Sequence, residues 1–278
     1  MKFFSLKTKR QKSGNSPEDR ERPPDECTLV NRMPLTNAAG GLIYHWRAAR
    51  FSRSGWAPFR TALAQWLGEW APPERDIILI GPSAGYCLTR EFITRFDKVI
   101  GVEPDPVARL LFVRRHRPRQ IEWCGDDFFT GASGDGLGQL RQFLEMRPGS
   151  AVLFCNFLGQ LKILVPWHDE DRVLGFWKEN LVRLLKERSF ASFHDRVSGP
   201  LKPRIEQVFK RQGRLEDSEI ISLCYDGGDS GELIDHETGG IFDPRKPHTY
   251  FAWPLTPGQW HLIEATKESR EIDVMCHL

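Results

Sequence analysis

An apolar run at residues 77–80 breaks directly into a glycine-rich turn at 81–85, and an amphipathic segment follows the turn. This order predicts a buried strand, a tight turn and a helix, an arrangement that brings backbone amides close to a nucleotide-like ligand. A second apolar run begins at Lys98 and ends in a carboxylate at Glu103. Dinucleotide-binding folds place an acid about twenty residues after such a turn. The two strand ends therefore predict a binding site.

Strand-like and helix-like segments alternate through the middle of the chain. The predicted strands continue at 121–128, 151–155 and 189–194, and the predicted helices lie at 88–96, 106–111, 137–146 and 173–185. The helix that begins at Pro106 is expected to bury Val107, Leu110 and Leu111. Continuous apolar strands between amphipathic helices indicate an α/β fold with a doubly wound, mostly parallel sheet. Two strand-like segments flank Pro257 and Gly258, which predicts a terminal antiparallel hairpin.

Composition restricts the class of protein. The chain has 278 residues with 40% hydrophobic content, enough for one main core, and its formal net charge of +2 gives no overall basic field for nucleic acid. Its six cysteines form no C-x-x-C pair, which favours a reduced, cytoplasmic protein. No stretch approaches the length of about 18 apolar residues that a membrane span requires. We therefore expect neither secretion nor a membrane partner.

Three regions differ in character. Residues 1–33 are polar and charged, which predicts a disordered tail. Residues 34–72 predict a helical cap or lid, because a segment rich in aromatic and basic residues precedes an apolar helical stripe. Residues 73–278 form the main predicted domain, with a glycine-rich insertion near 214–248. Residues 44–53 also fit a surface for single-stranded nucleic acid, although the lid is favoured.

This organisation, from about residue 57 to 270, resembles that of the class I S-adenosylmethionine-dependent methyltransferases, which have a Rossmann-like sheet. The resemblance implies that S-adenosylmethionine is the cofactor. It places the backbone of Gly81, Ser83 and Gly85 near the methionine portion and the ribose of that cofactor. It also implies that Glu103 accepts both ribose hydroxyls, and that Pro104, with Asp105 beside it, borders the adenine.

The resemblance assigns the next strand ends as well. Asp126 matches the position that accepts a hydrogen bond from the adenine amino group, with Asp127 and Phe128 beside it. Asn156, after the fourth predicted strand, faces the transferable methyl group in this family. Because oxygen and ammonium acceptors must lose a proton, His194 at the end of the fifth strand is the candidate proton acceptor.

Two departures from the family pattern keep alternatives open. The usual motif has an acid two residues before its first glycine and a glycine in the middle, where this chain has Leu79 and Ser83. A nicotinamide-binding fold is the alternative for the fold, but it would need G-x-G-x-x-G. A cofactor-binding protein without turnover and a methyltransferase acting on RNA or protein are the alternatives for the function. We expect a small-molecule methyl acceptor and no metal.

Overall fold

The computed structural model describes residues 41–125, 136–164, 170–205, 208–225 and 232–270, all of which belong to one compact unit, Arg32–Leu278. The predicted tail at 1–33 lies outside the described residues. So do Asp126, Asp127 and Phe128.

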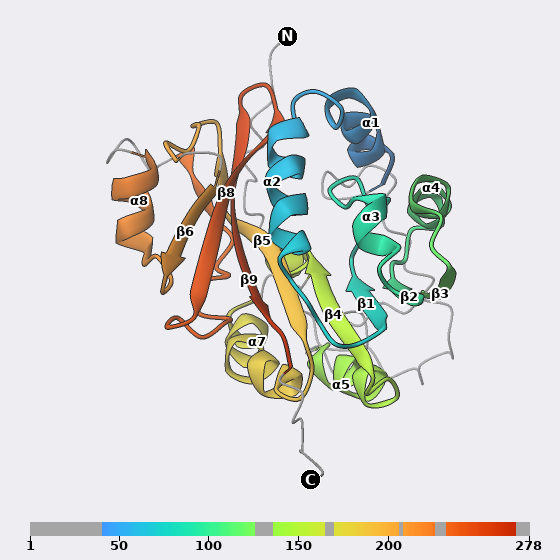
Figure 1. The fold of residues 1–278 in the computed structure, drawn as a ribbon. Coiled ribbons are helices and arrows are strands. Elements are labelled where there is room, and N and C mark those ends of the chain that lie inside the picture. The colour runs from blue at the N-terminus through green and yellow to red at the C-terminus, as the bar shows by residue number, and fades with distance from the viewer. Residues whose placement is uncertain (1–40, 126–135, 165–169, 206–207, 226–231, 271–278) are drawn as a thin grey trace, which may run out of the picture. The chain divides into compact units, whose positions relative to one another are not determined.

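One sheet organises the described residues (Figure 1). Its strands are β1 (Asp76–Ile80), β2 (Lys98–Val102), β3 (Gln120–Cys124), β4 (Ser150–Cys155), β5 (Phe190–Gly199), β6 (Val208–Gln212), β7 (Ile234–Asp235), β8 (Pro247–Thr256) and β9 (Gln259–Glu268). They are ordered β3-β2-β1-β4-β5-β9-β8-β6, and β7 pairs with β5. Strands β1 to β5 are parallel, whereas β9 is antiparallel to both β5 and β8. The predicted fold class, including the terminal hairpin, is confirmed.

Helices cover both faces of this sheet (Figure 1). They are α1 (Gly41–Phe51), α2 (Ala57–Gly68), α3 (Arg90–Ile93), α4 (Pro106–His116), α5 (Leu137–Glu145), α6 (Leu161–Leu164), α7 (Glu170–Leu185) and α8 (Asp217–Tyr225), with a 3-10 turn at Leu158–Gln160. Side chains of α2, α3 and α4 share one hydrophobic cluster with the sheet, and side chains of α5 and α7 share another. No helix in the described part of the chain is long and apolar enough to cross a membrane.

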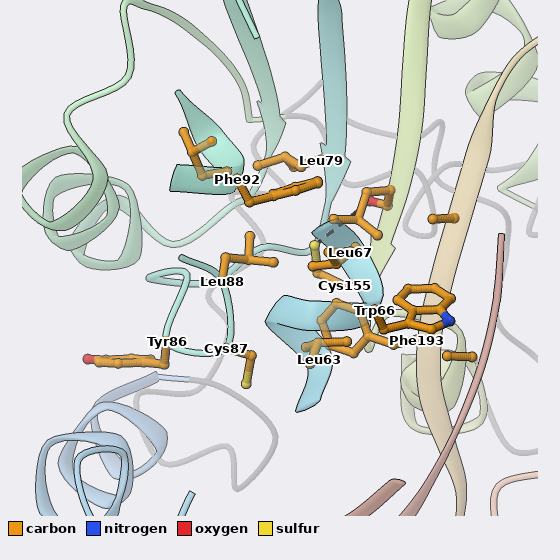
Figure 2. Packing of buried hydrophobic residues seen from close by; sticks show 14 of the residues in the cluster. Leu63, Trp66, Leu67, Leu79, Tyr86, Cys87, Leu88, Phe92, Cys155 and Phe193 are labelled. Atoms are coloured by element: carbon orange, nitrogen blue, oxygen red, sulfur yellow. Dashed lines mark hydrogen bonds between the residues drawn. The ribbon is translucent and has the colours of Figure 1, made fainter. Parts of the chain in front are cut away.

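The first cluster fixes α2 above the centre of the sheet. Figure 2 shows Leu63, Trp66 and Leu67 of α2 on the same side as Cys155 of β4 and Phe193 of β5. The burial of these side chains explains why residues 59–70 carry an apolar helical stripe. The helices predicted near residues 137–146 and 173–185 are present as α5 and α7.

Two helical predictions need correction. The segment after the glycine turn forms only a four-residue helix, α3, although its predicted apolar residues are buried. In α4, Val107 and Leu110 are 43% and 70% exposed, so the predicted inward face is wrong for both. The buried residues are instead Ala108, Phe112 and His116. The N-cap at Asp105 and the packing of Phe112 and His116 beneath the glycine turn set this rotation of the helix.

Gly85 is required by this helix packing. Its φ is +64°, and a Cβ there would lie 2.3 Å from His116 Nε2 and 2.9 Å from Phe112 Cδ2. We expect Gly85→Ala to lower the free energy of unfolding by about 2–3 kcal/mol, from left-handed strain and overpacking together. Urea denaturation measures this loss. Gly149→Ala is the control, because a Cβ at Gly149 meets nothing within 4 Å. Equal stability of the two variants would contradict the packing argument.

Candidate functional site

The glycine turn and Glu103 meet at the carboxyl end of the parallel strands. Strands β1 and β2 are paired in register from Asp76–Lys98 to Ile80–Val102, so their following residues emerge side by side. The backbone amide of Ser83 donates to Glu103 Oε2 at 2.8 Å, and the amide of Asp105 donates to Oε1 at 3.0 Å. Each carboxylate oxygen keeps capacity for a further donor. This contact joins the two predicted halves of the binding site.

The turn has left-handed backbone at Gly81, Ser83 and Gly85, with φ of 65°, 47° and 64°. For Ser83 this conformation costs about 1–2 kcal/mol, and its bond to Glu103 helps to offset the cost. A Cβ on Gly81 would lie 3.3 Å from the Phe157 side chain. The structure thus gives Gly81 and Gly85 packing reasons for being glycine. Their predicted contact with the cofactor remains a prediction.

Glu103 is held in an unusual electrostatic state. Its side chain is nearly buried, at 7% exposure. Burial raises the pKa of its carboxyl from 4.5 to about 7, and the amide bonds from Asp105 and Ser83 limit the rise. Since folding favours the protonated form, the contribution of this group to stability is present below its unfolded pKa and is lost as pH rises towards 7. A ligand that donates hydrogen bonds would favour the charged form instead.

Helix α1 is attached to the loop after β2. His45 Nε2 lies 3.0 Å from Asp105 Oδ2, and His45 Nδ1 lies 3.2 Å from the Tyr86 hydroxyl. Asp105 also caps α4 by accepting from the Val107 amide at 2.8 Å. Pro104 is exposed on this loop. These contacts hold α1 beside the loop that follows β2, and its function as a lid remains a prediction.

Asn156 follows β4 with left-handed backbone at φ 54°. Both ends of its amide contact Asp195: Nδ2 donates to Asp195 Oδ2 at 2.9 Å, and Oδ1 accepts from the Asp195 backbone amide at 2.7 Å. Gln160 Nε2 reaches the same carboxylate oxygen at 3.4 Å. In this structure Asn156 therefore orients Asp195, and its predicted place facing the methyl group stays a prediction.

His194 lies on the opposite face of β5 from Asp195, because successive strand residues alternate. It is fully buried, its Nδ1 lies 2.9 Å from Ser192 Oγ, and its ring packs near Phe242. Burial lowers its pKa to about 4. This environment gives the predicted proton acceptor no contact with Asn156 or Glu103. The role of His194 as proton acceptor remains a prediction.

A second histidine, which no local sequence pattern indicated, lies beside Asp195, the residue that follows His194. His261 Nδ1 of β9 lies 2.7 Å from Asp195 Oδ1, and both residues are buried. Burial opposes ionisation of Asp195, but its electrostatic interactions with His261 and His236 and its hydrogen bonds with His261 and Asn156 lower its pKa to about 2. The pair joins residues that are 66 positions apart. Only the pairing of β5 with β9 brings them together, so no local motif marked them.

His236 lies close to this pair, and one atom from each of Asp195, His236 and His261 lies within 4.8 Å of the others. This donor set is of a kind that holds transition metals. However, His236 Nδ1 already donates to the Gly159 carbonyl at 2.9 Å, and its Nε2 lies 2.9 Å from Ser198 Oγ. Protein hydrogen bonds therefore account for the position of His236 without a cation.

A shallow groove of about 410 Å³ lies away from the glycine turn. It is lined by residues of α2, β6, β8 and β9 and their flanks, namely Trp66, Glu69, Lys210, Arg211, Gln212, Pro247, His248, Thr249 and Lys267. Glu69 pairs with Lys210 and Lys267 there, which neutralises part of the charge. Because no residue of the glycine turn or of β2 lines the groove, we assign the candidate site to the strand ends.

The fold and the site together define a Rossmann-like protein with a candidate cofactor site at the carboxyl ends of β1 and β2. The mostly parallel sheet with its antiparallel end is the Rossmann-like fold that the sequence predicts, and the resemblance to the class I S-adenosylmethionine-dependent methyltransferases extends to this fold alone. No protein-family model matches the sequence, and no curated protein matches it.

Several solved structures are similar to this chain. The N-methyltransferase NodS from Bradyrhizobium japonicum, in complex with S-adenosyl-L-homocysteine, is 10% identical, with a TM-score of 0.40 over 81% of this chain and 98% of that one. Magnesium protoporphyrin IX methyltransferase from Synechocystis, with bound S-adenosylmethionine, is 12% identical, with a TM-score of 0.34 over 78% and 82%. The sugar N-methyltransferase KedS8 from Streptoalloteichus is 11% identical, with a TM-score of 0.33 over 89% and 86%.

Proposed function

We propose that this protein transfers a methyl group from S-adenosylmethionine to a small-molecule acceptor in the cytoplasm. The observation that carries the proposal is the contact between the glycine turn and Glu103, which puts a nearly buried carboxylate beside backbone amides at the strand ends. A carboxylate in this position suits a pair of ribose hydroxyls, since each of its oxygens has one acceptor site left. The residues present thus fit an adenosine-bearing cofactor.

The chain's own part in the reaction is mainly positioning. Glu103 would bind the ribose, and the backbone of residues 81–85 would lie along the rest of the cofactor, which supplies an already activated methyl group when bound. Holding the acceptor in line with that group supplies most of the rate enhancement that methyl transfer needs. Helix α1, attached through His45 and Asp105, would limit the access of water.

The surroundings of Asp195 favour a small acceptor. Aromatic rings pack closely here: Tyr44 lies 6.2 Å from Trp56, and Trp56 lies 5.1 Å from Trp253, measured between ring centroids. Helix α1 and β8 supply these rings together with the segment before α2. These closely packed rings belong to or contact the buried core, and they do not form the open basic groove that a polymer would need. Methylation of RNA or protein is therefore the less favoured reading.

A cofactor-binding protein without turnover is the second candidate. It is favoured by one observation, the buried apolar side chain of Leu79 where the family pattern has an acid. Calorimetry with S-adenosylmethionine and S-adenosylhomocysteine, followed by methyl release from tritiated cofactor with cell extract, separates the two. Binding with turnover supports the enzyme, binding without turnover supports the second candidate, and failure to bind either compound contradicts both.

The raised pKa of Glu103, about 7, predicts pH-dependent binding. Ribose hydroxyls that donate to the carboxylate stabilise its charged form, so binding below about pH 7 must release a proton. We expect the affinity for S-adenosylhomocysteine to fall by up to about tenfold for each pH unit below 7. Calorimetry in two buffers of different ionisation enthalpy measures both the affinity and the proton release. A constant affinity from about pH 5.5 to 8 would contradict this role of Glu103.

A further inference from the structure

We propose that His261, oriented by Asp195, is the base that takes the proton from a hydroxyl-bearing methyl acceptor. The inference rests on the proposed function and names its acceptor chemistry. Asp195 is held from three directions: Asn156 and Gln160 donate to Oδ2, and His261 Nδ1 lies 2.7 Å from Oδ1. A carboxylate so fixed can hold an imidazole in one orientation.

The hydrogen bond also fixes the tautomer of His261. An ionised carboxylate only accepts, so the nitrogen of His261 that faces Asp195 must carry the hydrogen. The lone pair of the neutral ring then lies on Nε2. That atom is buried and has no hydrogen-bond partner among the described residues, although His261 is 7% exposed. A buried lone pair without a partner costs free energy unless a ligand's donor group meets it.

Trp253, the residue opposite His261, offers a hydrogen-bond donor to the same acceptor. Trp253 of β8 pairs with His261 of β9 in the strand register, and their ring centroids are 5.6 Å apart. Trp253 Nε1 is likewise buried without a hydrogen-bond partner among the described residues. A hydroxyl oxygen can donate to a lone pair, accept from an N–H and still keep a second lone pair for the methyl carbon, whereas a neutral amine that accepts from the N–H has no lone pair left to attack with. The two unpartnered nitrogens therefore favour a hydroxyl acceptor.

The acceptor oxygen forms a bond to the methyl carbon while the bond between that carbon and the cofactor sulfur breaks, and its electron pair stays on sulfur. The hydroxyl proton moves to His261 Nε2, and the resulting imidazolium is stabilised by the Asp195 carboxylate before the proton passes to water. S-adenosylhomocysteine and a methyl ether are the products. The titratable groups near the Asp195–His261 pair include His236 after β7, Tyr44 of α1 and Cys87.

The test compares His261→Gln with His248→Gln. His248 is a matched control, because it is a buried histidine paired with a carboxylate, Glu264, at 2.7 Å on the opposite face of the same sheet. Turnover is measured as methyl release from tritiated cofactor with small-molecule cell extract. We expect His261→Gln to lose at least about 100-fold in turnover and to bind S-adenosylhomocysteine within about twofold of wild type. We expect His248→Gln to retain turnover once its fold is verified by circular dichroism.

A second readout does not depend on the acceptor. Nitrogen NMR of isotope-labelled histidine should show the hydrogen of His261 on Nδ1, and Asp195→Asn should populate the other tautomer because the anionic acceptor is lost. Turnover of His261→Gln near the wild-type level would overturn the proposal, as would an N-methyl product. Wild-type protein that binds the cofactor but methylates nothing would also overturn it. If wild type holds a stoichiometric metal ion that His261→Gln lacks, His261 is a metal ligand and not the base. If wild type fails to bind the cofactor, the proposed function itself is contradicted.

Discussion

Glu103→Ala should lose at least about 100-fold in affinity for S-adenosylhomocysteine, because each hydrogen bond to a charged group contributes about 1.5–3 kcal/mol and the ribose would make two. The substitution also frees the amides of Ser83 and Asp105, which Glu103 holds at 2.8 and 3.0 Å. The glycine turn would then lose the contact that fixes it beside β2. Glu103→Gln should lose nearly as much, since its NH2 group would face one of these N–H donors. Isothermal titration calorimetry measures both variants.

Glu122→Ala is the matched control for Glu103. Glu122 lies on the neighbouring strand β3 and is only half-buried, and it pairs with Lys98 at 2.6 Å and with Arg147 at 2.7 Å. Exposed ion pairs of this kind contribute about 1 kcal/mol or less. We expect unchanged affinity for S-adenosylhomocysteine in this variant. An equal loss of affinity in both variants, or none in Glu103→Ala, would contradict the assignment of Glu103.

Arg196→Met should lower the free energy of unfolding by about 3 kcal/mol, at the low end of the cost of removing one partner of a buried ion pair, because Asp217 and Asp235 remain solvated. Arg196 is buried in β5 and pairs with Asp217 of α8 and Asp235 of β7. Its Nε also lies 3.6 Å from Glu264 Oε2, and Glu264 is buried. Methionine keeps much of the volume but leaves these carboxylates without the cation. The loss is therefore electrostatic.

Urea denaturation measures this effect, and Arg245→Met is its control. Arg245 pairs with Asp243 at 2.9 Å at the surface, where screening by solvent leaves such a pair little effect on stability. We expect no measurable change in that variant. A loss below about 1 kcal/mol in Arg196→Met would contradict the prediction, because water or neighbouring groups would then stabilise the carboxylates as well as the guanidinium does.

Much of the fold was accessible from the sequence because it follows from periodicity. The apolar runs that precede Gly81 and Glu103 are buried strands, and the run at 151–155 lies between them and β5. The hairpin around Gly258 was predicted because its turn residues are local. The buried face of α4 was not predicted correctly, because the N-cap at Asp105 and the packing of Phe112 beneath Gly85 decide the rotation of the helix.

The candidate site also has one part that the sequence predicts and one part that it does not. The neighbourhood of Ser83 and Glu103 follows from strand order, and the structure brings these residues into contact. The prediction that His194 ends the fifth strand is wrong, because β5 continues to Gly199, and the His194 side chain faces away from Asp195. The alternative, His261, reaches Asp195 only because β9 pairs antiparallel to β5 next to a register shift. Such long-range pairing leaves no signal in the local sequence.

The most direct test of the central claim is a crystal structure of the wild-type protein with S-adenosylhomocysteine. We expect both ribose hydroxyls within hydrogen-bonding distance of the Glu103 carboxylate, with the ligand lying along the backbone of residues 81–85. Electron density for the ligand at any other place on the protein, with Glu103 bonded only to the amides of Ser83 and Asp105, would contradict it.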